Sequence, residues 1–285
     1  MIAGTSTGGI LACAYLMPDG IDRPLYSAEE VINFYLEHGD DIFHKSFKQK
    51  ILSGFGILGA EYSSEGLENN LEKYFGMTEL KELIKPCLVP SLDTEKRKCI
   101  FFKQHYAKTD ISENFYVADL LRGTTSAPTY FKPASIQSLS GETYSLVDGG
   151  LFANNPTLCA YTEVNKIFES KRNLTVRDVK ILSLGTGHND TIYKNDMIRK
   201  WGLIKWAKPS IDMMMSSSGK VTHYELTKLF DSFNCSNQYL RIDPKIPYEM
   251  TAMDNGSHKN MKRLKETGDI TFDKFREQLK TFLEL

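Results

Sequence analysis

The stretch MIAGTSTGGILA, residues 1–12, contains the pattern that decides the fold. Gly4-Thr5-Ser6-Thr7-Gly8 matches G-x-S-x-G and lies between a short apolar piece and an apolar, helix-forming run. A serine in this setting is typical of a nucleophile elbow, a sharp turn from a strand into a helix. Gly4 and Gly8 allow strained dihedral angles and close backbone approach. The backbone N–H of Thr7 and the helix N-terminus would then face negative charge developing near Ser6.

The same five residues have two other interpretations, a Gly/Thr-rich turn and a phosphate-binding loop. The phosphate-binding loop is disfavoured because no Gly-Lys-Ser/Thr follows the glycines and the chain has no G-x-G-x-x-G pattern. The serine pattern alone therefore leaves a catalytic serine and a plain turn open.

Composition excludes several classes of function. The net charge of −1, with both signs interspersed, gives no basis for nucleic-acid binding. The longest apolar run, Ile10–Met17, is too short for a transmembrane span, and no secretory signal is visible. We therefore expect a cytoplasmic protein or one peripheral to a membrane, with export by another route left open. The scattered cysteines and histidines predict no disulfide framework, metal site or cofactor.

Strand-like and helix-like runs alternate along the chain. We expect helices at 10–16, 27–35, 64–74, 117–121 and 155–168 and a C-terminal helix that buries Phe272, Phe275, Leu279, Phe282 and Leu283. Strands are expected at 87–92, 99–105, 143–147, 179–184 and 238–242. This alternation predicts a three-layer α/β/α fold with a central, mostly parallel sheet.

Asp148 is the carboxylate that stands out. It ends the expected strand 143–147 and precedes Gly149 and Gly150, which leave space around its side chain. An Asp-Gly pair is also an ordinary hairpin turn. Because ligands of α/β sheets bind beyond the carboxyl ends of strands, we expect Ser6, Asp148 and the turn at Gly185 to converge.

Two segments are candidates for contact with lipid. Residues 43–59 combine aromatic and basic side chains with three glycines, as in an interfacial flap, although an ordinary surface segment fits the same pattern. Trp201 and Trp206 mark the second candidate, and either one also suits a protein core.

Several ordered motifs resemble the patatin-like phospholipase family. They are the Ser6 elbow, Leu92–Lys98, Thr125–Phe131, Asp148-Gly149-Gly150 with Asn154-Asn155-Pro156, and Ser183–Gly187. The resemblance covers residues 1–190 best, within a single domain 1–285 whose part 191–285 would be a C-terminal helical extension.

The resemblance implies a lipid acyl hydrolase of phospholipase A type without a cofactor. Ser6 would be the nucleophile and Asp148 the general base, with Thr7 N–H at the oxyanion and Gly4, Gly8, Gly149 and Gly150 as motif glycines. The substrate would be a phospholipid or galactolipid at a membrane surface.

One departure from the family leaves alternatives open. Family members carry a glycine-rich oxyanion loop upstream of the elbow, and the printed chain begins three residues before Gly4. A weakly active enzyme is therefore expected, and a non-catalytic lipid-binding or storage relative is the alternative. A Ser–His–Asp esterase with His188 or His223 ranks third.

Overall fold

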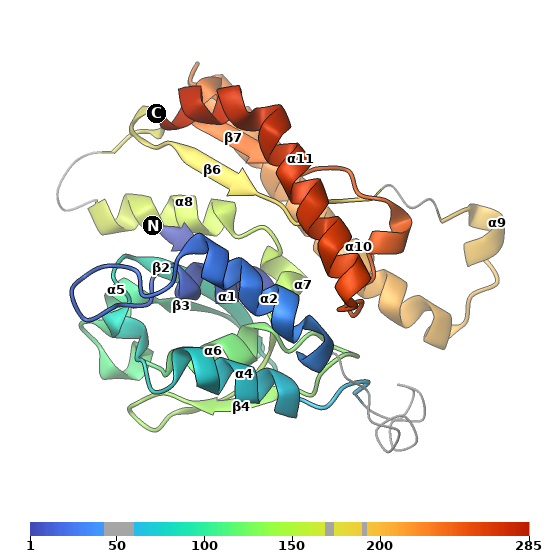
Figure 1. Cartoon of the computed structure of the whole chain (residues 1–285), viewed down its shortest axis with the longest axis horizontal. Helices are drawn as coiled ribbons and strands as arrows, with labels where there is room; N and C mark the ends of the chain where they lie inside the picture. Colours follow the sequence, from blue (N-terminus) through green and yellow to red (C-terminus); the bar gives the residue numbers. More distant parts are fainter. Residues whose placement is uncertain (43–59, 169–173, 190–192, 285) are drawn as a thin grey trace.

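The computed structural model of the chain describes residues 1–42, 60–168, 174–189 and 193–284. The proposed flap at 43–59 lies outside the described residues. Figure 1 shows the chain with its elements labelled. In chain order they are β1 (Ile2–Ala3), α1 (Thr7–Ala14), α2 (Ala28–Ile42), α4 (Glu65–Phe75), β2 (Cys87–Asp93), β3 (Lys98–Lys103), α5 (Gln104–Ala107), α6 (Val117–Thr124), β4 (Ala134–Gln137), β5 (Thr143–Asp148), α7 (Gly150–Ala153), α8 (Thr157–Phe168), β6 (Ile181–Leu184), α9 (Asn195–Ile198), α10 (Leu203–Ser232), β7 (Tyr239–Ile242) and α11 (His258–Leu283).

The central sheet is organised around β2. Antiparallel β3 pairs with one edge of β2 from Leu88 to Asp93. The opposite edge is shared, because β1 pairs in parallel with residues 87–88 and β5 pairs antiparallel with residues 91–93. The carboxyl ends of β1 and β5 therefore point at each other along one edge of β2. They meet opposite Val89 and Pro90, and Pro90 has no N–H to donate.

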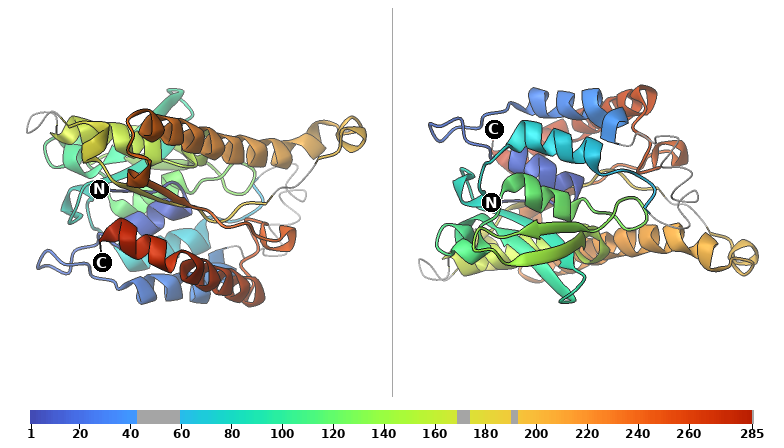
Figure 2. Two further views of the ribbon diagram at one scale, coloured as in Figure 1. Left: turned by 90° about the horizontal axis from the view of Figure 1, so that it is seen from above. Right: turned by 90° about the horizontal axis from the view of Figure 1, so that it is seen from below.

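Helices cover both faces of the strands, so the predicted three-layer α/β/α fold is confirmed. The left view of Figure 2 shows α8 and α10 in one layer, α2 and α11 in the other, and strands between them. A large core fills the space between the sheet and α1, α2, α4 and α6. The smaller parallel pair β6–β7 packs one face on α8 and α10 and the other on α11.

The expected strands are present, and β4 was not predicted from the sequence. Parallel pairing, expected throughout the sheet, joins β1 to β2 and β6 to β7, whereas β3, β4 and β5 add antiparallel pairs. The strands of the C-terminal third extend beyond a purely helical extension, since β7 follows α10.

Two details of the C-terminal helix were wrong. Phe272 and Leu283 of α11 are exposed, at 53% and 46%, whereas Phe282 is buried as expected. The apolar spacing on α11 is wider than the narrow stripe that β6 and β7 cover. No described helix is both long enough and apolar enough to cross a bilayer.

Candidate active site

Ser6 lies on a strained turn between β1 and α1. Its φ of 56° and ψ of −126° are rare for a residue with a side chain. A Cβ atom on Gly4 would lie 1.9 Å from the carbonyl oxygen of Gly8, so only glycine fits at position 4. The Ser6 hydroxyl does not cap the helix that it precedes. The elbow predicted from the sequence is therefore present, and the hydroxyl is not used to cap α1.

The two motif glycines of the elbow have different roles. A Cβ atom on Gly8 would have no heavy atom within 4 Å, so close backbone approach does not require glycine there. The close approach expected at Gly8 occurs instead at Gly9, whose Cβ would lie 3.1 Å from Val89 and 3.2 Å from Thr124. Gly9 lets α1 begin directly against β2 and α6.

Thr124, at the end of α6, holds the elbow from behind. The backbone N–H of Ser6 donates to Oγ1 of Thr124 at 3.0 Å, and the same hydroxyl donates to the carbonyl oxygen of Pro90 at 2.6 Å. Thr124 is fully buried. Sequence reasoning placed this threonine in an irregular loop and missed it, because neighbouring Thr125 and Ser126 look equivalent.

Asp148 ends β5 and is almost completely buried. Its Oδ1 atom accepts a hydrogen bond from the N–H of Gly150 at 2.7 Å. Burial raises the pKa of Asp148 from 3.8 to about 6, and the Ser6 hydroxyl and the Gly150 N–H partly oppose that rise. The carboxylate is therefore a stronger base than an exposed aspartate.

The Ser6 hydroxyl and the Asp148 carboxylate meet where β1 and β5 converge. Ser6 interacts with the carboxylate closely enough to lower its pKa. The Oδ2 atom of Asp148 is buried, yet it accepts no hydrogen bond of normal geometry from the described residues. The contact is thus looser than a standard hydrogen bond, as is common before a substrate binds. Oδ2 is the carboxylate oxygen left to take a proton.

The glycines after Asp148 are needed for packing. A Cβ atom on Gly149 would lie 2.3 Å from the carbonyl oxygen of Pro90, so backbone blocks any side chain. A Cβ atom on Gly150 would lie 2.5 Å from the terminal methyl of Met215 on α10. Gly149 therefore makes room for the β2 backbone rather than around the carboxylate, whereas Gly150 brings α10 next to the site.

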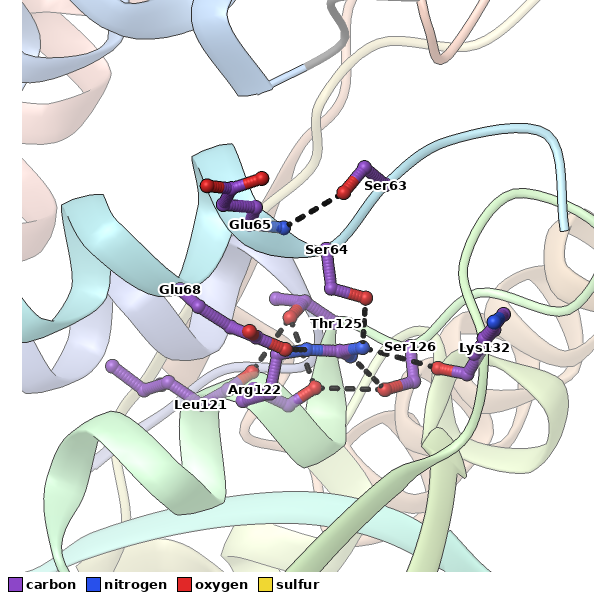
Figure 3. A network of polar contacts seen from close by, with 9 residues as sticks. All are labelled: Ser63, Ser64, Glu65, Glu68, Leu121, Arg122, Thr125, Ser126 and Lys132. Atoms are coloured by element: carbon purple, nitrogen blue, oxygen red, sulfur yellow. Dashed lines mark hydrogen bonds and ion pairs between the residues drawn. The ribbon is translucent and has the colours of Figure 1, made fainter. Parts of the chain in front are cut away.

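A buried arginine supports the segment beside Asp148, as Figure 3 shows. Arg122 on α6 donates to Glu68 at 2.8 Å, to the hydroxyls of Ser64 and Ser126, and to the carbonyl oxygen of Lys132 at 3.2 Å. The Asp148 N–H in turn donates to the carbonyl oxygen of Ser126 at 3.0 Å. Arg122 thereby links α4 and the segment after α6 to the end of β5. A lone arginine among apolar residues 117–121 was the sequence signal for it.

The start of α1 offers a donor to negative charge near Ser6. Thr7 is its first residue and is exposed. The next two N–H groups, of Gly8 and Gly9, donate to the carbonyl oxygens of Thr5 and Ser6 at 2.9 and 2.8 Å. The first N–H groups of a helix have no intrahelical partner and carry partial positive charge. The position of Thr7 N–H is thus the one expected from the sequence.

The histidines of the third hypothesis lie elsewhere. His188 Nδ1 is 3.6 Å from Asp243, and His223 Nδ1 lies 2.9 Å from the Tyr239 hydroxyl, both beside the β6–β7 pair. The turn at Gly185, expected at the site, packs on Asp243 as well. Among the described residues no histidine is hydrogen-bonded to Ser6 or Asp148, and no group of three metal-ligating side chains gathers.

The fold and this site define an α/β protein with a serine on a nucleophile elbow beside a buried aspartate. The chain belongs to the patatin-like phospholipase family, whose sequence model matches residues 1–161. Members of this family are lipid acyl hydrolases, which places the chain among hydrolases at the level of the family.

Relatives from plants match most of the chain. "Patatin-like protein 2" of Oryza sativa subsp. indica is 32% identical over 300 residues, covering 96% of this chain and 74% of the relative. "Patatin-like protein 1" of Arabidopsis thaliana is 32% identical over 297 residues, covering 94% and 70%. "Probable inactive patatin-3-Kuras 1" of Solanum tuberosum is 30% identical over 285 residues, covering 94% and 74%. Similarity to this family thus extends to a protein named as inactive.

Proposed function

We propose that this chain is a lipid acyl hydrolase of phospholipase A type in which Ser6 and Asp148 form a catalytic dyad. The observation that carries the proposal is the convergence of a strained, uncapped serine with a buried carboxylate that has one unpaired oxygen. Family membership supports the class of substrate, fatty acyl esters of phospholipids or galactolipids at a membrane surface.

In the first half-reaction, Asp148 takes the proton of Ser6 Oγ while that oxygen bonds to the ester carbonyl carbon. The carbonyl oxygen becomes an oxyanion near the Thr7 N–H and the positive end of α1. When the tetrahedral intermediate collapses, the carbon–oxygen bond to the lipid alcohol breaks. The departing alcohol takes the proton back from Asp148, which leaves an acyl-Ser6 ester.

In the second half-reaction, Asp148 takes a proton from water as the water oxygen attacks the acyl carbon. Collapse of this second intermediate breaks the bond to Ser6 Oγ, and Ser6 regains its proton from Asp148. The fatty acid leaves and the enzyme returns to its starting state. A base with a pKa of about 6 is largely ionised at neutral pH, as both steps require.

The test is covalent labelling with a fluorophosphonate, followed by identification of the modified residue and by hydrolysis of a monomeric short-chain ester. We expect one adduct on Ser6, and a loss of turnover of about 10³-fold or more in Ser6→Ala and in Asp148→Asn. Ser216→Ala and Asp196→Asn, both at exposed positions, are matched controls. His188→Ala and His223→Ala should retain activity, and a loss confined to one of them would establish the esterase triad instead.

A non-catalytic lipid-binding protein is the second candidate, favoured by the relative whose name marks it as inactive. A folded chain that forms no adduct and hydrolyses neither a short-chain ester nor a phospholipid would establish this alternative.

A further inference from the structure

The N-terminal end of α10 extends from the body of the molecule together with α9. Figures 1 and 2 show this end projecting away from the layers in every view. We call residues 193–208 the α10 tip. Its base is fixed to the body by Lys208, whose ammonium pairs with Glu61 and lies 4.7 Å from the centre of the Tyr130 ring.

Large aliphatic side chains of the tip face solvent. Leu203 is 91% exposed, Ile204 71% and Met197 45%. Leu203 and Ile204 open α10, so they lie at the far end of a helix whose later residues Leu226 and Phe230 are fully buried. Adjacent, fully hydrated aliphatic side chains on a projecting end are typical of a surface that is covered in use.

The tip is also strongly basic. It contains five Lys or Arg residues and one carboxylate, Asp196, in a chain whose net charge is −1. Lys194, Arg199, Lys200 and Lys205 are all exposed, so these charges lie around the aliphatic pair. The charge of the tip is therefore complementary to an anionic surface.

Aromatic rings stand between the aliphatic end and the charged ring of side chains. Trp201 and Trp206 are half-buried against each other, with ring centres 5.2 Å apart, and Tyr193 lies 5.4 Å from Trp201. Tryptophan and tyrosine are enriched at the level of lipid headgroups, where one end of the ring is apolar and the other is hydrated.

We propose that the α10 tip binds the surface of membranes that contain anionic phospholipids. Leu203 and Ile204 enter the interface, the tryptophans lie at headgroup level, and the four cations contact lipid phosphates. A narrow, convex end buries little area against a folded protein partner, whereas a bilayer surface closes around it.

The tip and the candidate active site lie on the same rigid helix. From Ile204 to Met215, which packs on Gly150, α10 rises about 16 Å, at about 1.5 Å per residue. That length is about half of a ~30 Å hydrocarbon core. A tip inserted at the headgroups would therefore hold the site within reach of one acyl chain. Membrane binding itself does not depend on the proposed hydrolysis.

The test measures binding of the full chain carrying Ser6→Ala to sedimented vesicles. The vesicles are phosphatidylcholine alone or phosphatidylcholine mixed with phosphatidylserine. We expect binding to the anionic vesicles that weakens with added salt. Leu203→Ser with Ile204→Ser should weaken it by about tenfold or more. Arg199→Gln with Lys200→Gln should weaken it by roughly 20-fold, at about fivefold per cation.

Matched controls carry the same changes elsewhere on the surface. Ile21→Ser with Ile270→Ser removes aliphatic side chains that are 78% and 70% exposed, and Lys262→Gln with Arg263→Gln removes two exposed cations of α11. These controls should bind like the parent, and thermal melts should show all variants folded. Equal binding by tip variants and parent, or no binding by the folded parent, would overturn the proposal.

Two further readouts separate the remaining outcomes. If light scattering without lipid shows that the parent self-associates and the tip variants do not, the tip is an interface between copies and the proposal fails. With Ser6 present, the tip variants should hydrolyse a monomeric short-chain ester at the parental rate. Absent hydrolysis by every form would refute the proposed function and leave the vesicle result unaffected.

Discussion

The backbone N–H of Ser6 donates to the side-chain hydroxyl of Thr124 at 3.0 Å, across a sequence separation of 118 residues. Ser6 has a backbone conformation that costs on the order of 1–3 kcal/mol, so something must hold it. Thr124 does so from a fixed position, because its hydroxyl also donates to Pro90 in the central strand. One buried hydroxyl therefore connects the elbow to β2 and α6.

Replacing Thr124 by valine should impair the elbow without changing the shape of the core. The N–H of Ser6 and the carbonyl of Pro90 would lose their partner, which costs about 1–3 kcal/mol of unfolding free energy. Because Ser6 would no longer be held, kcat on a short-chain ester should fall more than KM rises. Thr124→Ser keeps the hydroxyl and should restore most of both.

Thr125→Val is the matched control. The Thr125 hydroxyl is buried and donates to the Leu121 carbonyl at 2.7 Å, within its own helix end. This variant should lose stability with kcat largely unchanged. An equal fall of kcat in both valine variants would show that Thr124 has no positioning role.

The pH dependence of hydrolysis should report Asp148. Burial raises its pKa to about 6, and the proposed base is active only when ionised. We expect kcat/KM to rise with the ionised fraction below pH about 6 and to level off above it. The measurement is a pH profile on a neutral, monomeric ester. A profile that falls as pH rises through 6 would mean that the protonated acid is the active form.

The same pKa makes a prediction about stability. Between the unfolded pKa of 3.8 and the folded pKa of about 6, the folded state binds a proton that the unfolded state has lost. The stability that this proton contributes is complete below pH 3.8 and is lost as pH rises through 6. Asp148→Asn avoids the buried charge, so above pH 6 it should be more stable than the parent by about 2–3 kcal/mol.

Denaturant unfolding at several pH values checks this prediction. The advantage of Asp148→Asn should vanish near pH 4, and the exposed control Asp196→Asn should change stability by less than about 0.5 kcal/mol throughout. A destabilised Asp148→Asn at neutral pH would show that the ionised carboxylate is well stabilised, and the raised pKa would be wrong.

The sequence predicted Ser6 and Asp148 because each belongs to a local pattern, an elbow and a strand followed by two glycines. It did not predict that β1 and β5 approach β2 from opposite directions, since strand pairing depends on contacts far apart in sequence. Thr124 was missed for the same reason, because its partner lies 118 residues away.

Helix α10 illustrates a second limit of the sequence. It runs unbroken over 30 residues even though Pro209 and Gly219 lie inside it, and each of these residues normally argues against a helix interior. Pro209 lies near the start of the helix, and Gly219 packs close to Asn154 and Asn155. Tertiary packing against α7 and α8 outweighs local propensity here.

Arg122 should matter for stability much more than its ion-pair partner does. Arg122→Leu would remove donors from Ser126, which is fully buried, and from Ser64 and Lys132, at a cost of about 1–3 kcal/mol. The Glu68 side chain is 53% exposed, so Glu68→Gln should cost less than about 1 kcal/mol. Denaturant unfolding compares them, and equal losses would place the stabilisation in the ion pair alone.

The glycines around the site should separate the needs of folding from those of substrate. In Gly4→Ala and Gly149→Ala the new Cβ would lie 1.9 and 2.3 Å from backbone carbonyl oxygens, so we expect folding to fail or to lose about 3 kcal/mol or more. Gly8→Ala meets open space inside α1 and should gain about 0.5–1 kcal/mol. Thermal melts and ester hydrolysis are measured on all three. A stable Gly8→Ala that no longer hydrolyses would mean that bound substrate occupies the space above Gly8. A Gly8→Ala as unstable as Gly4→Ala would contradict the elbow geometry described for Ser6.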